Sequence, residues 1–109
     1  MGPLDLVKLS PLMARTSGRR EIAVGLIDGP VNASHPDLAG CSIQEIPGKL
    51  RGTCASADST ACTHGTFVAG ILSARRASRA PGICPACTLL VRPIFIENAN
   101  GDGDMPQWS

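Results

Sequence analysis

The sequence predicts an α/β fold built around a mostly parallel β-sheet. Two apolar runs, residues 21–27 and 88–96, have the length of strands, and each is closed by a turn-rich segment, which is typical of strands buried inside a sheet. Between them, residues 63–74 have the pattern of a helix. Strands that alternate with a helix along the chain favour a parallel sheet. We therefore expect a layered domain to which these residues contribute the first strands.

The composition is that of a folded globular domain. Hydrophobic residues make up 43% and charged residues 17% of the 109 residues, which argues against a disordered chain. The net charge of +1 gives no electrostatic basis for binding nucleic acid or a membrane surface. No apolar run approaches the roughly 20 residues that a membrane-spanning helix needs. We therefore expect neither a nucleic-acid partner nor a membrane partner.

The N-terminus and the cysteines together favour a cytoplasmic location. Asp5 and Lys8 interrupt the stretch in which a signal peptide would have its apolar region. The five cysteines are an odd number, so at least one has no intrachain partner. Reduced thiols are therefore expected.

Residues 4–12 are predicted to form a short helix or a docking arm. The apolar run of residues 21–27 then ends at the turn signal of residues 28–30, and this predicts a strand buried on both faces. Residues 41–46 predict a second short strand, and residues 47–61, rich in Gly, Ser, Thr and Ala, predict a surface loop.

The predicted helix over residues 63–74 has Phe67, Ile71 and Ala74 on one face, which we expect to be its buried face. Gly65 and Gly70 each cost roughly 1 kcal/mol relative to alanine inside a helix. Their presence therefore predicts a close approach to a neighbouring backbone at both positions.

A basic segment, residues 75–79, follows the helix and ends at Pro81-Gly82. Arginines at a helix C-terminus are favoured by the helix dipole, which is the simplest interpretation of this segment. The third strand, residues 88–96, leads into a turn-rich loop at residues 98–104.

Two segments contain candidate catalytic side chains. Asp28 lies where a buried strand ends, and in open α/β sheets functional groups gather beyond the carboxyl ends of strands. His64 lies near the start of the predicted helix, and histidine acts as a general base near neutral pH when a partner holds its tautomer. Either residue alone suits a turn or a structural role. Together, 36 positions apart (64 minus 28), they supply an acid and a base on successive elements of one sheet.

These segments resemble the motifs of the subtilases, the subtilisin-like serine proteases. The family has an Asp at the end of an apolar strand, then a His-Pro-Asp-Leu turn, then His-Gly-Thr followed by a His-Val-Ala-Gly-like stretch. The corresponding segments are Ala23-Val24-Gly25-Leu26-Ile27-Asp28-Gly29, His35-Pro36-Asp37-Leu38 and His64-Gly65-Thr66-Phe67-Val68-Ala69-Gly70. The later segment Pro81-Gly82-Ile83-Cys84-Pro85 resembles the Gly-Val-Ala-Pro turn that precedes the family's next strand. The order, spacing and context agree from about residue 21 to residue 96.

The resemblance implies a three-layer fold with only its N-terminal portion present, an arm over residues 1–20 and part of a peptidase domain over residues 21–109. It also implies a serine endopeptidase in which Asp28 orients His64 and His64 takes the proton of a serine. Ser109 lacks the family's context, so the serine and the oxyanion-hole asparagine are expected outside this chain. The implied partners are a peptide or protein substrate and the remaining half of the protease domain, and no cofactor is implied.

Two departures from the family pattern refine the resemblance. Gly29-Pro30 follows the aspartate directly, where Thr-Gly or Ser-Gly is usual, which removes a hydroxyl near the carboxylate. Phe67 replaces a common histidine and is expected to serve packing. With the cysteine-containing background, these features resemble the bacterial subtilases of cyanobactin maturation, which process ribosomally made peptide precursors.

Further binding residues follow from the same comparison. Many subtilases bind calcium through an aspartate like Asp37 and a loop after the His helix. Here that loop is the basic segment 75–79, which lacks neutral oxygen donors, so we expect no calcium and no other metal. Gly101, Asp102 and Gly103 lie where the family's edge strand pairs with substrate, although a simple surface turn fits them equally well.

Two other classes of function fit parts of the sequence. The chain could be a non-catalytic split or degenerate subtilase fragment that binds a peptide or a partner chain. Cys84 and Cys87 have the CxxC spacing of a redox pair or of half a zinc site. Packed free thiols, a disulfide and a metal site all remain compatible with that spacing.

Overall fold

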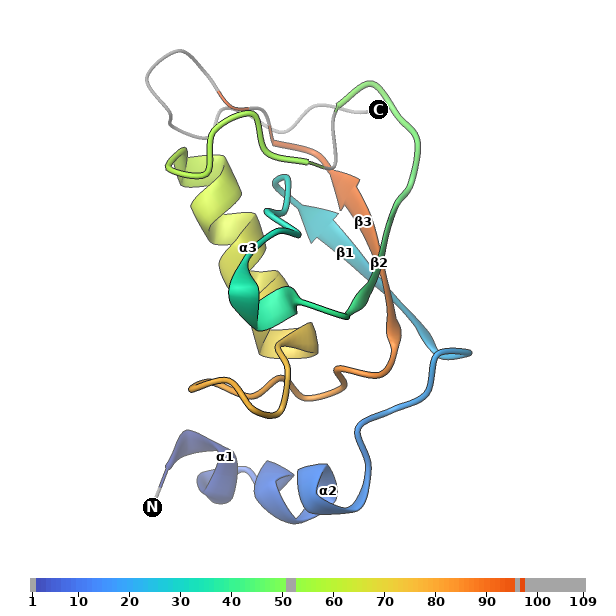
Figure 1. Ribbon diagram of the computed structural model, residues 1–109, viewed down its shortest axis with the longest axis vertical. Coiled ribbons are helices and arrows are strands. Elements are labelled where there is room, and N and C mark those ends of the chain that lie inside the picture. Colours follow the sequence, from blue (N-terminus) through green and yellow to red (C-terminus); the bar gives the residue numbers. More distant parts are fainter. Residues whose placement is uncertain (1, 51–52, 96, 98–109) are drawn as a thin grey trace.

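A three-stranded parallel sheet forms the centre of the protein. The computed structural model describes residues 2–50, 53–95 and 97, and Figure 1 shows the strands side by side with a long helix against them. The strands are β1 (Ala23–Asp28), β2 (Ser42–Glu45) and β3 (Thr88–Pro93), in the order β1-β3-β2. Both pairings are parallel. The predicted α/β class and the parallel sheet are confirmed.

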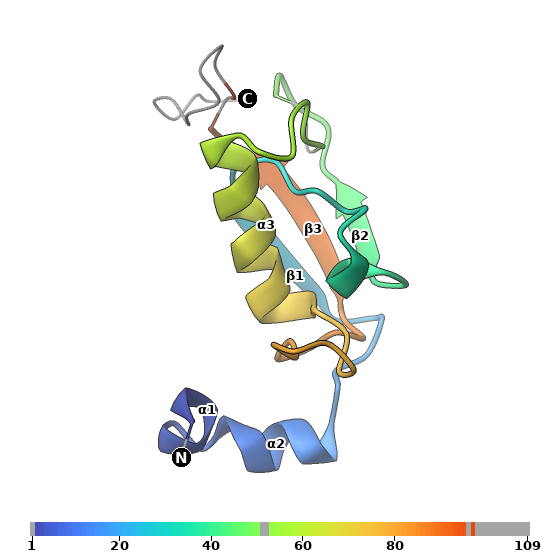
Figure 2. The same ribbon diagram turned by 60° about the vertical axis from the view of Figure 1, so that its left-hand side comes forward.

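The core lies between this sheet and one helix, α3 (Thr60–Ser73), which covers one face of the sheet (Figure 2). Because side chains alternate along a strand, Leu89 and Val91 of β3 both point to this face, and each is 1% exposed. The buried cluster that they join also contains Leu26, Val31, Leu38 and Ala69. Aliphatic side chains therefore build the core, as the scarcity of aromatic residues requires.

The opposite face of β1 is open in the described part of the chain. Ile27 is 67% exposed, and Ala23 and Gly25, which share its face, are exposed as well. The prediction that this strand is buried on both faces is therefore wrong for the described residues. The described residues place no helix over this face, which leaves the Ile27 side chain largely exposed.

Helix α3 begins at Thr60, three residues earlier than predicted, because Ser59 caps it. The Ser59 hydroxyl accepts a hydrogen bond from the Cys62 N–H at 3.1 Å, which satisfies one of the free donors of the first turn. The residues before His64 are therefore held in a regular helix and not in a surface loop.

The buried face of α3 differs from the predicted one. Phe67 and Ile71 are 67% and 46% exposed, and Ala74, which is buried, lies just after the helix. The residues of α3 that are buried are small: Ala61, Cys62, Gly65, Ala69 and Ser73. Small side chains let the helix lie close to the sheet and to the loop after β1. Val68 and Leu72 also pack against the core cluster, whereas Phe67 and Ile71 face outward.

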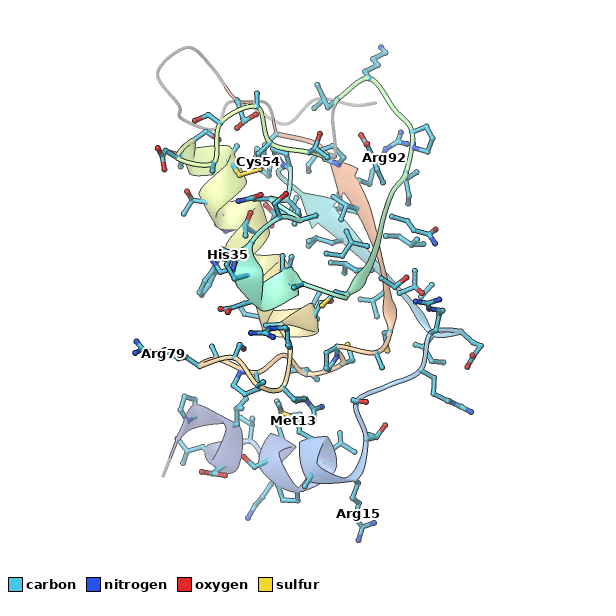
Figure 3. The ribbon with its side chains drawn as sticks, in the orientation of Figure 1. Met13, Arg15, His35, Cys54, Arg79 and Arg92 are labelled. Atoms are coloured by element: carbon cyan, nitrogen blue, oxygen red, sulfur yellow. A yellow bond between two sulfur atoms is a disulfide. The ribbon has the colours of Figure 1, made fainter. Side chains whose placement is uncertain are left out.

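The N-terminal arm consists of two short helices, α1 (Pro3–Leu6) and α2 (Leu9–Arg15), which lie beyond one end of the sheet (Figure 1). Arg76 fixes this arm to the rest of the chain. Its guanidinium donates to the carbonyl oxygens of Met13 and Thr16 in the arm, the latter at 2.9 Å, and Met13 is buried there (Figure 3). The helix-dipole interpretation of the basic segment is wrong for Arg76, because α3 ends at Ser73 with no basic residue in its last turn.

The cysteines are not all reduced. Cys54 and Cys62 form a disulfide, labelled at Cys54 in Figure 3, whereas Cys41, Cys84 and Cys87 are free thiols. The expectation of reduced thiols throughout is therefore wrong for the first pair. Spacing alone did not reveal it, because the α3 N-terminus folds back onto the loop that contains Cys54.

In the described part of the chain, no helix has the length and hydrophobicity to cross a membrane.

Candidate active site

The structure brings Asp28 and His64 together. Asp28 is the last residue of β1, and His64 lies in the second turn of α3, beside the carboxyl end of that strand. The Oδ1 atom of Asp28 is 2.8 Å from Nδ1 of His64. The carboxylate is 13% exposed, whereas the imidazole is 64% exposed. A shielded acid therefore holds one nitrogen of a ring whose remainder faces outward.

This geometry determines what the ring can do. When Nδ1 carries the proton and donates it to Asp28, Nε2 has a free lone pair and can accept a proton. An imidazole with its tautomer fixed in this way is the arrangement of a general base. Among the described residues, no serine hydroxyl is hydrogen-bonded to His64.

Main-chain donors hold both the carboxylate and the carbonyl group of Asp28. The Gly29 N–H donates to Asp28 Oδ1 at 2.6 Å, and the Ile94 N–H donates to the Asp28 carbonyl oxygen at 2.7 Å. The hydroxyl that the family usually has after the aspartate is absent here. A main-chain donor on the following residue holds the carboxylate instead.

Two glycines allow the strand end and the helix to approach this closely. A Cβ atom on Gly29 would lie 2.5 Å from the Ala61 carbonyl oxygen, and one on Gly65 would lie 2.8 Å from the Gly29 carbonyl oxygen and closer still to that of Pro30. Neither position has room for a side chain. The prediction of a close backbone approach is confirmed at Gly65 and wrong at Gly70, where a Cβ would meet nothing within 4 Å.

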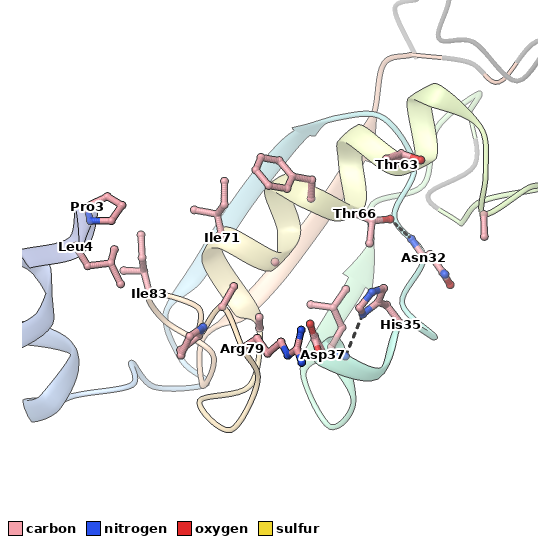
Figure 4. A pocket seen from close by; sticks show the side chains of 17 residues that line it. Pro3, Leu4, Asn32, His35, Asp37, Thr63, Thr66, Ile71, Arg79 and Ile83 are labelled. Carbon is pink, nitrogen blue, oxygen red and sulfur yellow. Dashed lines mark hydrogen bonds between the residues drawn. The ribbon is translucent and has the colours of Figure 1, made fainter. Parts of the chain in front are cut away.

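Two further hydrogen bonds shape the loop between β1 and β2 (Figure 4). The Asn32 N–H donates to the Thr66 hydroxyl at 2.8 Å, which joins the loop to α3 two residues after His64. His35 accepts from the Asp37 N–H through Nδ1 at 3.0 Å and so caps the short 3-10 helix η1 (Pro36–Leu38). His35 therefore has a local structural role.

Glu97 has a structural role near the start of α3 that the sequence pattern did not predict. Its carboxylate accepts from the N–H groups of Ala55 and Ser56, at 2.7 and 3.2 Å, and from the hydroxyl of Ser59. It thereby ties the chain after β3 to the loop that leads into α3. An isolated glutamate after a strand has no sequence pattern that would identify this role.

Replacing Glu97 with glutamine is expected to lower the free energy of unfolding by about 1–3 kcal/mol. One carboxylate oxygen becomes an NH₂ group, and this donor would face an N–H or O–H donor of the loop with no acceptor between them. Urea denaturation of the two proteins measures the change. Glu21→Gln is the matched control, since Glu21 is exposed and no hydrogen bond of its side chain is found in the described chain. Equal losses in the two variants would contradict the role of Glu97.

Potential metal ligands gather at one place in the described residues. Cys54, Cys62 and Glu97 offer ligand atoms within 4.8 Å of one another. Because the two sulfur atoms are joined in a disulfide, neither is the thiolate that zinc requires. At the position considered for calcium, the Asp37 carbonyl oxygen accepts from the Arg75 N–H at 2.8 Å.

A largely apolar cavity of about 640 Å³ runs along the outward face of α3. Phe67, Ile71 and Ile83 line it, together with Pro3 and Leu4 of the arm (Figure 4). Neither Asp28 nor His64 lines this cavity. The predicted substrate residues Gly101, Asp102 and Gly103 lie outside the described residues.

Solved structures resemble this chain in fold and sequence. A serine-to-alanine mutant of the protease domain of PatA has 34% identity and a TM-score of 0.69, over 75% of this chain and 30% of that chain. The prenylagaramide maturation protease PagA has 31% identity and a TM-score of 0.65, over 84% of this chain and 29% of that chain. The chain thus spans less than a third of either relative.

A more distant structure shares the fold alone. The PatG macrocyclase domain has 17% identity and a TM-score of 0.58, over 85% of this chain and 44% of that chain. No family model matches the chain, and no curated protein matches it in sequence.

Proposed function

Because this chain belongs to the subtilisin-like proteases of the cyanobactin-maturation type, we propose that it supplies the acid and the base of a serine endopeptidase. The observation that supports this function most directly is the contact of 2.8 Å between Asp28 Oδ1 and His64 Nδ1. The pair lies beyond the carboxyl end of a parallel strand, where open α/β sheets place their functional groups.

In the proposed mechanism, His64 is the general base and Asp28 orients it. Asp28 accepts the Nδ1 proton, and Nε2 then takes the proton of a serine hydroxyl as that oxygen attacks the peptide carbonyl carbon. The imidazolium formed is stabilised by the Asp28 carboxylate, and it returns its proton to the leaving amine. Water then releases the acyl group from the serine by the same sequence of proton transfers.

The serine and the donors that stabilise the oxyanion are proposed to come from outside the 109 residues. The sheet supports the addition of further elements from outside these residues. Strand β1 pairs with β3 along one of its edges, and Ile27 on the open face of β1 is 67% exposed. An apolar face of this kind is stable when further strands and helices cover it. The remaining half of the protease domain is therefore the proposed partner.

Peptide precursors are the proposed substrates. The relatives are a protease domain of PatA and a prenylagaramide maturation protease, and the identity of 31–34% to them favours the same class of reaction over general protein digestion. Hydrolysis of a peptide bond in a ribosomally made precursor is the reaction that we propose.

A fluorophosphonate probe, which reacts with activated serines, tests this function. We expect the probe to label the full-length polypeptide that contains this chain. We expect no labelling of a polypeptide limited to residues 1–109, because the nucleophile is proposed to lie outside them. The labelled residue is identified by mass spectrometry of the digested protein. If neither polypeptide is labelled, the peptidase function is wrong, and a subtilase-like binding protein becomes the better description.

A further inference from the structure

The CxxC segment forms a tight turn that brings its two cysteines together. The Cys87 N–H donates to the Cys84 carbonyl oxygen at 3.1 Å, and the first and last Cα atoms of such a turn lie less than about 7 Å apart. Disulfides join Cα atoms roughly 4.4–6.8 Å apart. The pair therefore needs no movement of distant elements to become a disulfide.

The same turn is the surface on which the N-terminal arm docks. The Ala86 N–H donates to the Ser17 carbonyl oxygen at 2.8 Å. Gly18, at φ 89°, lies directly over the sulfur of Cys87, where a Cβ atom would collide with it and lie 3.3 Å from Cys84 Cβ. The two cysteines thus lie underneath the segment that connects the arm to β1.

Arg76 binds both sides of this docking surface. Its guanidinium donates to the carbonyl oxygens of Gly82 and Ile83, each at 3.0 Å, just before the turn. The same group donates to Met13 and Thr16 in the arm. The position of the arm therefore depends on the conformation of residues 82–87.

We propose that Cys84 and Cys87 are a second disulfide site, and that oxidation of this pair fixes the turn on which residues 13–18 dock. The chain already contains one disulfide, Cys54–Cys62, so it accommodates such bonds between cysteines close in sequence. The oxidised and reduced forms differ in how firmly the arm is held.

The chemistry balances with a low-molecular-weight disulfide such as oxidised glutathione as oxidant. Cys84, which is half-buried, attacks one sulfur as a thiolate and releases one glutathione thiol. The buried Cys87 then loses its proton and attacks Cys84 Sγ, which expels the second glutathione thiol. Two protein thiols lose two electrons and two protons in total, and the oxidant gains them.

The environment of Cys84 favours a stable structural bond over rapid exchange. Burial raises the pKa of the Cys84 thiol above its ordinary value, and the neighbouring Cys87 thiol raises it further, although the Arg76 guanidinium opposes the rise. Little thiolate is then present near neutral pH, so the pair exchanges more slowly than a catalytic CxxC motif.

The test equilibrates the full chain with oxidised or with reduced glutathione, alkylates free thiols and maps the peptides by mass spectrometry. With oxidised glutathione we expect the peptide that contains residues 84–87 to be unalkylated and lighter by two hydrogen atoms, while Cys41 is alkylated. We also expect trypsin to cleave at Arg15, Arg19 and Arg20 about tenfold more slowly in the oxidised protein, since cleavage follows the opening of the arm.

Cys84→Ser is expected to make the cleavage rate independent of the glutathione redox state, whereas Cys41→Ser is expected to retain the dependence. Three results would overturn the proposal: alkylation of both Cys84 and Cys87 after oxidation, a disulfide from either of them to Cys41, or equal cleavage rates in the two redox states. The wild-type measurements decide the question even when a variant does not fold. They do not depend on peptidase activity, so they are separate from the test of the proposed function.

Discussion

Replacing His64 with alanine is expected to lower kcat/KM for peptide hydrolysis by the full-length protein by about 10⁴–10⁶-fold, because His64 is the group proposed to take the proton of the serine. His64 is the ring that Asp28 holds at 2.8 Å. Since the ring is 64% exposed, its loss removes little packing, and we expect stability to be nearly unchanged. Steady-state kinetics on a precursor-derived peptide, with urea denaturation alongside, separates the two effects.

Asp28→Asn is expected to lower kcat/KM as well, by about 10⁴-fold. The asparagine amide can still hold the imidazole ring, but it favours the wrong tautomer. His35→Ala is the matched control. His35 is bound to the Asp37 N–H in η1, so its loss should leave kcat within a few-fold of the parent value while costing about 1 kcal/mol of stability. An equal loss of activity in the His35 and His64 variants would contradict the assignment of the base.

Gly65→Ala is expected to lower the free energy of unfolding by about 3 kcal/mol or more. This loss exceeds the usual cost of overpacking, since the added methyl group would meet backbone atoms and not a movable side chain. The new Cβ would lie 2.8 Å from the Gly29 carbonyl oxygen and closer to that of Pro30. Relief requires α3 to move away from the loop after β1, which would lengthen the contact between Asp28 and His64. Urea denaturation measures the first effect, and residual kcat at a temperature where the variant is folded measures the second.

Gly70→Ala provides an internal comparison in the same helix. Nothing lies within 4 Å of a Cβ at this position, so the alanine variant should be as stable as the parent protein or more stable by up to about 1 kcal/mol, from helix propensity alone. Similar destabilisation at both positions would mean that general helix effects, and not the backbone contact at Gly65, explain the result.

Much of the candidate site was predictable from local sequence. The apolar run that ends at Asp28 and the small-residue segment around His64 identify a strand and a helix, and parallel pairing places the carboxyl ends of strands at one edge of a sheet. The contact between Asp28 and His64 agrees with that prediction. The resemblance in motif order is supported by structures with 31–34% identity.

The errors arose where packing between segments, and not the local pattern, decides the outcome. Phe67 and Ile71 follow the spacing of a buried stripe, yet they face outward, because α3 lies close enough to the sheet and the β1 loop that small side chains fill the contact. The Cys54–Cys62 disulfide depends on where the helix N-terminus lies relative to its preceding loop. Arg76 was assigned to a helix dipole, whereas its partners are carbonyl oxygens of the arm, more than 60 residues earlier for Met13.

The sequence by itself determined the α/β class, the strand and helix that present Asp28 and His64, and the family, because periodicity, turn residues and motif order are local properties of the chain. Only the tertiary structure decided which face of α3 is buried, which cysteines pair, how Glu97 holds the loop before the helix, and how the arm docks on residues 82–87. Except for the cysteine pair, which is separated by only eight residues, each of these depends on distances between segments far apart in sequence. Packing of the whole domain sets those distances.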